Sequence, residues 1–140
     1  MTPDELLEAG RPFLDKILTP AGFVFARGTV DKGSGGRFVQ AAYIRSTRQL
    51  SFSVRHELGL VAYVDGALRL AHEDYLRAVW SKAHKGQYPG FNTAPVQAFA
   101  DLASDLEQFG GAFLDRDPAP FAKLCAWAAD HPRPTGLQAL

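Results

Sequence analysis

Four histidines and one cysteine are the residues of this chain best suited to metal binding or acid–base chemistry. His72 is followed by Glu73, but no second histidine stands four residues further on, where a helical zinc site would need it. Cys125 is the single cysteine, so the chain can form neither an internal disulfide nor a thiolate cluster. It falls on an apolar helical stripe, which favours an inert thiol. We therefore predict no metal site and no cofactor.

The sequence also contains no recognisable nucleophile. Ser34 lies in a glycine-rich stretch, and the Gly-x-Ser-x-Gly pattern of a nucleophile elbow does not occur. The carboxylate pairs Asp101/Asp105 and Asp115/Asp117 are typical of solvated helix faces and caps. A glycosidase-type pair stays open as an alternative, since sequence does not give the separation of two carboxyl groups. We assign no catalytic residue, and the sequence favours a protein that is not an enzyme.

A set of basic and aromatic residues in the middle of the chain indicates a binding surface. Arg37, Tyr43 and Arg45 share one parity of a predicted strand, and Arg55 lies on the polar parity of the next strand. If the two runs share a face of the sheet, they form a surface suited to a carboxylate or an acidic partner. The alternative is an ordinary solvated face, which most antiparallel sheets have.

Two further groups of residues are candidates for binding. The aromatic rings of Tyr88 and Phe91, in a loop of turn-forming residues, could anchor a partner or tuck under the helices. A cleft between the sheet and the C-terminal helices would instead bind a small molecule or support hydrolysis. Its lining would come from two strands and one helix, and would consist of His56, Tyr63, His72 and Tyr75. A histidine there could act as an acid–base group, or simply have its ring nitrogens satisfied locally.

The elements that position these residues are mainly strands. In the clearest of them, the apolar residues Leu50, Phe52 and Val54 alternate with polar ones, the signature of a half-buried strand. Asp65-Gly66 predicts a two-residue hairpin turn. Because every connection is short, we expect an antiparallel meander of four or five strands. The predicted strands are Phe23–Val30, Phe38–Ser46, Leu50–Glu57, Gly59–Val64 and a short one holding Leu68 and Leu70.

Helices are predicted both before and after the strands along the chain. Thr2, Pro3 and Glu5 form a capping box that begins an N-terminal helix, and Gly10 and Pro12 predict a kink or a break in it. Helical spacing then returns, and the fold class is α+β with three C-terminal helices packed on one sheet face. These helices run from His72 to about Lys85, from Asn92 or Thr93 to Phe113 across a weak point at Gly110-Gly111, and from Asp117 to before Pro132.

Length and charge restrict the classes of function. The 140 residues fit one domain, predicted over residues 1–132, with a loose tail at 133–140. Fifteen basic residues balance fifteen acidic ones, so the chain lacks the positive field that binds nucleic acid. The acidic N-terminus is unlike a signal peptide, and no apolar run is long enough to cross a membrane. We expect a cytoplasmic protein without nucleic-acid or membrane partners.

Three short stretches, Leu58–Tyr63, His72–Tyr75 and Tyr88–Phe91, resemble small bacterial proteins of unknown function, some of which are found near toxin–immunity systems. The resemblance implies a single-domain α+β protein and an immunity-like role, and it transfers no functional residue. Together with the missing catalytic set, it favours a non-catalytic protein-binding module with a protein partner. A homodimer that pairs exposed sheet edges is the alternative assembly.

Overall fold

The N-terminal helix α1 (Pro3–Leu18) begins as the sequence predicts. The computed structural model describes residues 1–33, 36–80 and 94–133. In it, the backbone N–H of Glu5 donates to the Thr2 hydroxyl at 3.1 Å, and the Glu5 carboxylate accepts from the Thr2 N–H at 2.8 Å. This capping box satisfies two amide groups that would otherwise lack helical partners, and fixes the start of the helix.

The predicted division of α1 at Gly10 and Pro12 does not occur, since one helix runs through both residues. Gly10 is buried where α1 crosses the later helix α3, and a Cβ atom on it would lie 2.3 Å from the ring of Phe99. Its role is therefore close packing rather than interruption. Pro12 is exposed, while Leu14 and Leu18 beyond it are fully buried. Burial of this second half of the stripe outweighs the local cost of a helical proline.

The five-stranded antiparallel meander is confirmed. Each strand pairs with the next in sequence, in the order β1-β2-β3-β4-β5, so β1 and β5 are the edges. The two-residue turn between the last two strands is Gly66-Ala67, one residue later than the predicted Asp65-Gly66, and Gly66 has φ +60°, a conformation that favours glycine. The strands are β1 (Val24–Gly33), β2 (Gly36–Arg45), β3 (Arg48–Val54), β4 (Leu58–Asp65) and β5 (Leu68–Ala71).

The helices after the sheet follow the predicted order. Helix α3 ends at Phe109, and the chain restarts as a single turn, α4, so the weak point at Gly110-Gly111 separates two helices rather than lying inside one. Asp117 accepts from the N–H of Ala119 at 3.0 Å and thereby helps to begin the last helix. The bounds are α2 (His72–Trp80), α3 (Pro95–Phe109), α4 (Gly111–Leu114) and α5 (Ala119–Asp130).

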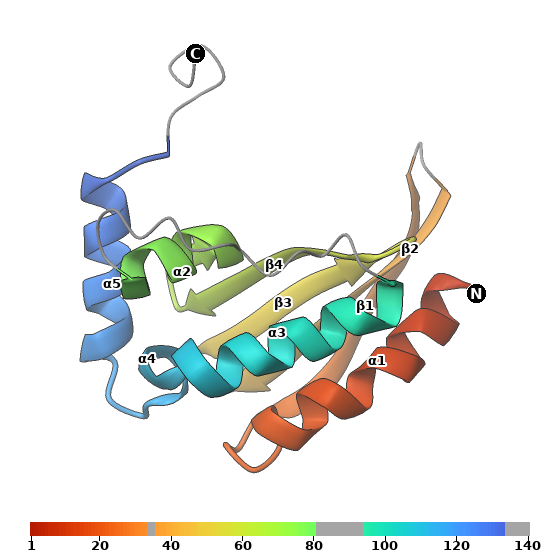
Figure 1. Ribbon diagram of the computed structural model, residues 1–140, viewed down its shortest axis with the longest axis horizontal. Helices are drawn as coiled ribbons and strands as arrows, with labels where there is room; N and C mark the ends of the chain where they lie inside the picture. Colours follow the sequence, from red (N-terminus) through yellow and green to blue (C-terminus); the bar gives the residue numbers. More distant parts are fainter. Residues whose placement is uncertain (34–35, 81–93, 134–140) are drawn as a thin grey trace.

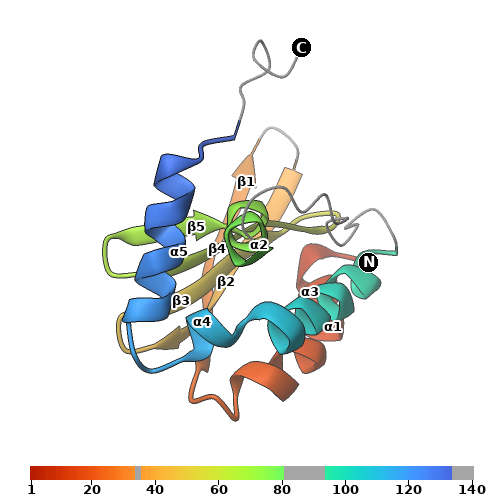
Figure 2. The ribbon, with the colours of Figure 1, turned by 60° about the vertical axis from the view of Figure 1, so that its left-hand side comes forward.

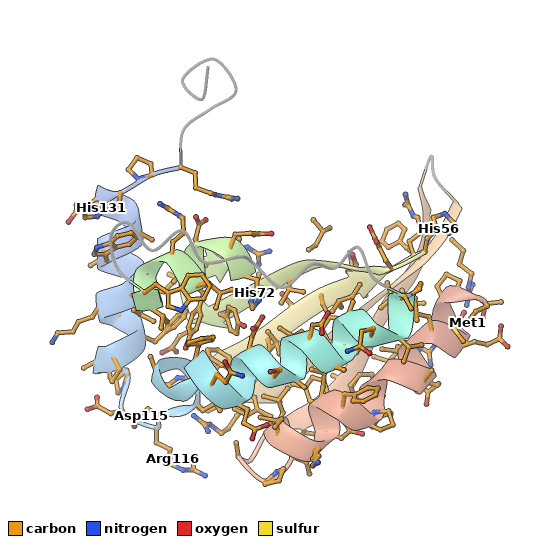
Figure 3. The ribbon with its side chains drawn as sticks, in the orientation of Figure 1. Met1, His56, His72, Asp115, Arg116 and His131 are labelled. Carbon is orange, nitrogen blue, oxygen red and sulfur yellow. The ribbon has the colours of Figure 1, made fainter. Side chains whose placement is uncertain are left out.

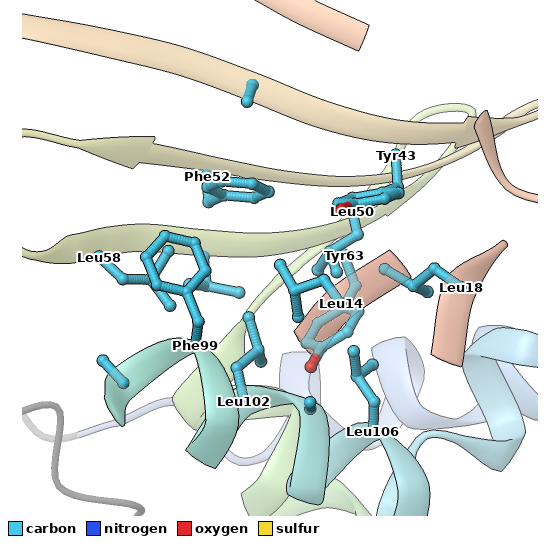
Figure 4. Close-up of a cluster of buried hydrophobic side chains, with 14 of the residues drawn as sticks. Leu14, Leu18, Tyr43, Leu50, Phe52, Leu58, Tyr63, Phe99, Leu102 and Leu106 are labelled. Carbon is cyan, nitrogen blue, oxygen red and sulfur yellow. The ribbon is translucent and has the colours of Figure 1, made fainter. Parts of the chain in front are cut away.

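The molecule has two layers, with the described helices on one face of the sheet, as predicted. Figures 1 and 2 show α1 and α3 side by side across the middle strands and α2 and α5 beside the β5 edge. The core lies between the layers (Figure 4), where the alternate residues Leu50 and Phe52 of β3 meet the helices. Phe52 packs edge-on against Phe99 at 6.1 Å between ring centres. Apolar burial in this single layer is the main stabilising term of the fold.

The end of the described chain is held against α2. The Nε atom of Arg133 lies 2.9 Å from the Asp74 carboxylate, and a guanidinium nitrogen lies 3.9 Å from Glu73. Arg133 was predicted to open the loose tail, so the contacts of the domain extend at least one residue further than the predicted boundary. The other predicted tail residues, 134–140, lie outside the described residues.

Candidate functional site

Arg37, Tyr43 and Arg45 lie on the face of β2 that the helices cover, although Arg37, near the start of the strand, stays exposed. Tyr43 is fully buried, and its hydroxyl donates a hydrogen bond to Asp15 of α1 at 2.6 Å. Burial and this bond raise the pKa of Tyr43. Arg45 donates to the carbonyl of Ala21 at 2.8 Å. These contacts fasten α1 and the turn after it to the sheet, and they leave Tyr43 unable to touch a partner.

Arg37 completes this fastening at the other end of α1. Its Nε atom lies 2.9 Å from the carboxylate of Asp4, which also contacts Arg27. The hydrogen bond from Arg37 is the main reason that the pKa of Asp4 is lowered. Because these side chains are partly open to water, salt screens the interaction, and its role is to orient the helix rather than to hold a ligand.

Arg55 lies on the opposite face of the sheet. The antiparallel register of β2 and β3 places it beside Phe38 rather than beside Arg37, and its guanidinium carbon is 5.1 Å from the centre of the Phe38 ring. The single basic face on which the predicted binding surface depended is therefore not formed. Tyr88 and Phe91, the other predicted binding residues, lie outside the described residues.

The residues predicted to line a cleft are packed together or lie apart. Tyr63, His72 and Tyr75 are at most 2% exposed, and the rings of Tyr63 and Tyr75 stack at 4.4 Å. Phe113 closes over Tyr63 at 5.0 Å. His56 is exposed near the β1–β2 end of the sheet, away from His72 (Figure 3). Tyr63, His72 and Tyr75 therefore form solid core, and a substrate cannot reach them.

The buried histidine is held by a polar chain that the sequence does not predict. His72 lies 2.8 Å from the Tyr63 hydroxyl through Nδ1, and 2.9 Å from Asp105 of α3 through Nε2. Burial raises the pKa of Tyr63 well above its usual value, and that of Tyr75 to about 12. Asp105 was predicted to be solvated, but its side chain is only 13% exposed. The chain satisfies buried polar groups and thereby joins β4, α2 and α3.

Arg48, the first residue of β3, is a second buried polar group. It is 4% exposed, and it donates to the carbonyls of Phe113 at 2.8 Å and Asp117 at 3.0 Å, on either side of the α4–α5 turn. Its Nε atom lies 3.4 Å from Asp65. Alternation along β3 could have indicated this burial, since Arg48 lies on the same side of the strand as the apolar Leu50. Arg48 ties the α4–α5 turn to the sheet and offers no open donor to a ligand.

The described part of the chain contains no cluster of three or more residues that could hold a metal ion. Cys125 is partly buried on α5, and burial raises the pKa of its thiol, which lowers its reactivity at neutral pH. None of the described helices is both long and apolar enough to cross a membrane.

The face of the sheet opposite the described helices, which we call the open face, has an unusual surface. The strand registers align one residue of small volume from each of the five strands into a continuous row across the sheet. A sheet face exposed only to water normally carries long polar and charged side chains instead. This small-residue row consists of Ala26, Ala42, Ser51, Ala62 and Ala71.

Larger side chains flank the small-residue row and make it a trough. On one side the registers align the Ile44 ridge, which consists of Val24, Ile44, Gln49, Val64 and Arg69. On the other side stands the Leu60 ridge, which consists of the larger Gln40 and Leu60 with the small Ser53 between them. A hollow of about 410 Å³ lies between them, lined by residues of both ridges and of the row.

Leu60 is the most unusual residue of this face. Ser51 pairs with Ala62 and Ser53 with Gly59, so two residues of β4, Leu60 and Val61, stand opposite one residue of β3. This is a β-bulge, and Leu60 takes the left-handed conformation there, with φ +52°, which glycine normally supplies. Its side chain is nonetheless 81% exposed. The strained backbone thus holds a large apolar group in solvent at the edge of the hollow.

The comparisons with known proteins give no class for this site. No protein-family model, no curated protein and no solved structure matches the chain. The functional conclusion therefore depends on the geometry and chemistry of the open face alone.

Proposed function

We propose that this protein is a non-catalytic protein-binding module and that the open face of its sheet is the docking surface. One observation carries the proposal: a trough of small side chains crosses five strands between two ridges that expose apolar groups. Val24, Ile44 and Leu60 of these ridges are 69%, 38% and 81% exposed. Exposed apolar side chains gathered around a hollow are characteristic of interaction sites.

The chemistry of the chain favours binding over catalysis. A hydrolase would need a nucleophile or a general base next to a space for its substrate. The buried polar groups of the described chain, around His72 and Arg48, are instead engaged in hydrogen bonds inside the core. The open face supplies Ser51, Ser53 and Gln49 among its polar groups beside the hollow, and these residue types suit hydrogen bonding to a partner.

An immunity-like role is one form of this proposal. Capture of a toxin would require a stable surface that is complementary to one partner, without a cofactor. A preformed sheet face meets this requirement because binding then costs little conformational entropy. The proposal of a protein partner does not depend on this particular role.

Site-specific photo-crosslinking tests the proposal. A photoreactive amino acid is placed at Ser51, on the floor of the trough, and as a control at Ser104, on an exposed position of α3. In cells of the organism that encodes the chain, we expect a protein crosslink from position 51 and none from position 104. The crosslinked protein, once purified, should bind with an affinity that Ser51→Phe lowers at least about tenfold and Ser104→Phe leaves unchanged. The proposal would be contradicted if position 51 gave no crosslink, whether or not position 104 gave one. It would also be contradicted if Ser51→Phe left the affinity unchanged.

A further inference from the structure

We infer that the segment of a partner that fits the open face is an amphipathic α-helix with carboxylates on both flanks. The inference rests on the proposed function and specifies the chemistry of the partner. It follows from the width of the trough, the state of the strand backbones and the charges of the face, which are independent of one another.

The trough has the dimensions of a helix. The Ile44 ridge and the Leu60 ridge stand two residues to either side of the small-residue row, which makes them about 13 Å apart along the strands. A helix with its side chains is about 10–12 Å wide. Five strands at their usual spacing make the trough about 19 Å long, which about thirteen helical residues would fill.

The backbone of the sheet disfavours an extended segment on this face. Strands β2, β3 and β4 are each paired on both sides, so their N–H and C=O groups are already engaged in the sheet. An extended peptide gains its affinity from main-chain hydrogen bonds along a sheet edge, and the open face cannot provide them. A helix satisfies its own backbone and needs only side-chain contacts, which the apolar ridges supply.

The face carries a net positive charge. Among the described strand residues, the registers place two charged residues on the open face, Arg69 on the Ile44 ridge and Asp31 opposite Phe38. Arg55 lies beyond the Leu60 ridge, just after the end of β3, with Phe38 between it and Asp31. Glu57, the nearest acidic residue in sequence, belongs to the β3–β4 turn. Within the described chain neither arginine has an ion-pair partner, and the Nε atom of Arg55 is buried without a hydrogen bond. Arginine binds carboxylates through paired hydrogen bonds, so acidic groups are favoured on both flanks of the helix.

The same charges argue against a second copy of this chain as the occupant. A two-fold symmetric dimer would place the open face against itself. Arg55 and Arg69 would then meet Asp31 as the one acidic residue that the strand registers place on the opposing face, so at least one guanidinium group from each copy would be buried without compensation, which is costly. A different protein that carries carboxylates removes this cost.

Selection from two display libraries tests the inference on the purified full-length protein. One library randomises a helix face on a helical scaffold, and the other randomises a strand on a hairpin scaffold of similar size. We expect binders from the helical library, enriched in Leu, Ile and Met at helical spacing and in Asp and Glu on the flanks. Their dissociation constants should rise at least about tenfold in Arg55→Glu and in Arg69→Glu, and stay within about threefold in the control Arg116→Glu. Arg116 is exposed in the α4–α5 turn, on the helical side of the molecule.

The outcomes separate this inference from the proposed function. Some binders could lose their affinity in Ser51→Phe and yet be extended or lack acidic residues. Such binders would contradict the helical acidic partner but would still support the open face as the docking surface. Binders from both libraries that are all indifferent to Ser51→Phe would overturn both. If Arg55→Glu alters the circular dichroism spectrum, Arg55→Gln removes the charge while keeping a polar group of similar length, and the same loss of affinity is expected.

Discussion

The hydroxyl of Tyr63 lies 2.8 Å from Nδ1 of His72, and both side chains are almost completely removed from solvent. On its other side, His72 meets the carboxylate of Asp105 at 2.9 Å. A carboxylate only accepts hydrogen bonds, so in the neutral imidazole Nε2 carries the hydrogen and Nδ1 accepts from the tyrosine. His72 thus satisfies groups from β4 and α3 at once, in an arrangement that resembles a catalytic relay but has no access to a substrate.

Replacing His72 should therefore reduce stability strongly. In His72→Phe both the Tyr63 hydroxyl and the Asp105 carboxylate lose a partner inside the core, and we expect the free energy of unfolding to fall by about 2–4 kcal/mol. Tyr63→Phe removes only a hydroxyl and should cost about 1 kcal/mol. Urea denaturation of the single and double variants gives the coupling energy. Strictly additive losses in the double variant would show that Tyr63 and His72 do not act as a unit.

Arg48 should contribute to stability through the α4–α5 turn. Arg48→Met keeps the length of the side chain but leaves the carbonyls of Phe113 and Asp117 without their donor, and we expect a loss of about 2–4 kcal/mol. Arg69→Met, an exposed control, should change stability by less than about 0.5 kcal/mol. Hydrogen exchange would locate the effect in α4 and α5. A similar loss in both variants would contradict the role of Arg48.

Two glycines provide a matched test of helix packing. Gly10→Ala places a methyl group against the Phe99 ring, where an ideal Cβ would lie 2.3 Å away, and we expect a loss of about 1–3 kcal/mol despite the better helix propensity of alanine. At Gly111, in α4, the same substitution meets nothing within 4 Å and should be neutral or stabilising by up to about 1 kcal/mol. Thermal unfolding followed by circular dichroism measures both variants. A tolerated Gly10→Ala would show that α1 and α3 can move apart at little cost.

The pKa shifts of the buried tyrosines predict alkaline unfolding. Burial is the largest cause of the raised pKa of Tyr43, Tyr63 and Tyr75 in the folded protein. In the unfolded chain these groups titrate near pH 10, so their contribution to stability is complete below that pH and falls as the pH rises above it. Urea midpoints should be constant from about pH 7 to 9 and fall steeply above about pH 10. Tyrosinate absorbance of the three groups should appear together with the loss of circular dichroism, and titration in a fully folded protein would contradict their burial.

The sequence defined the strands better than it defined their faces. Leu50 and Phe52 stand out from polar neighbours, so the pattern of β3 is unambiguous. In β2 both parities contain apolar residues, with Tyr43 on one and Ala42 and Ile44 on the other, and local pattern alone does not decide which parity the helices cover. The placement of Arg37 and Arg45 depended on that decision.

The buried hydrogen bonds of His72 and Arg48 could not be predicted from local sequence pattern for a different reason. Asp105 and His72 are 33 residues apart in the sequence, and Arg48 and Phe113 are 65 apart, so each contact exists only once the helices have folded back onto the sheet. The small-residue row has the same origin, because it needs the register of all five strands. Alternation predicts which residues of one strand share a face, whereas the register between strands determines which residues of the neighbouring strands lie beside them.

Substitution of Leu60 distinguishes an effect on stability from an effect on binding. Because a left-handed leucine costs about 1–2 kcal/mol relative to ordinary backbone, and its side chain is 81% exposed, Leu60→Gly should leave the free energy of unfolding unchanged or raise it by up to about 1 kcal/mol. The same variant removes the largest exposed apolar group beside the hollow and should weaken binders of the open face at least about tenfold. Isothermal titration of a selected helical binder, with urea denaturation of the free proteins, measures the two effects separately. Leu60→Asn, which also tolerates positive φ, should behave in the same way. A large loss of stability in both variants would show that Leu60 serves the fold, because a residue kept for packing cannot be replaced at no cost.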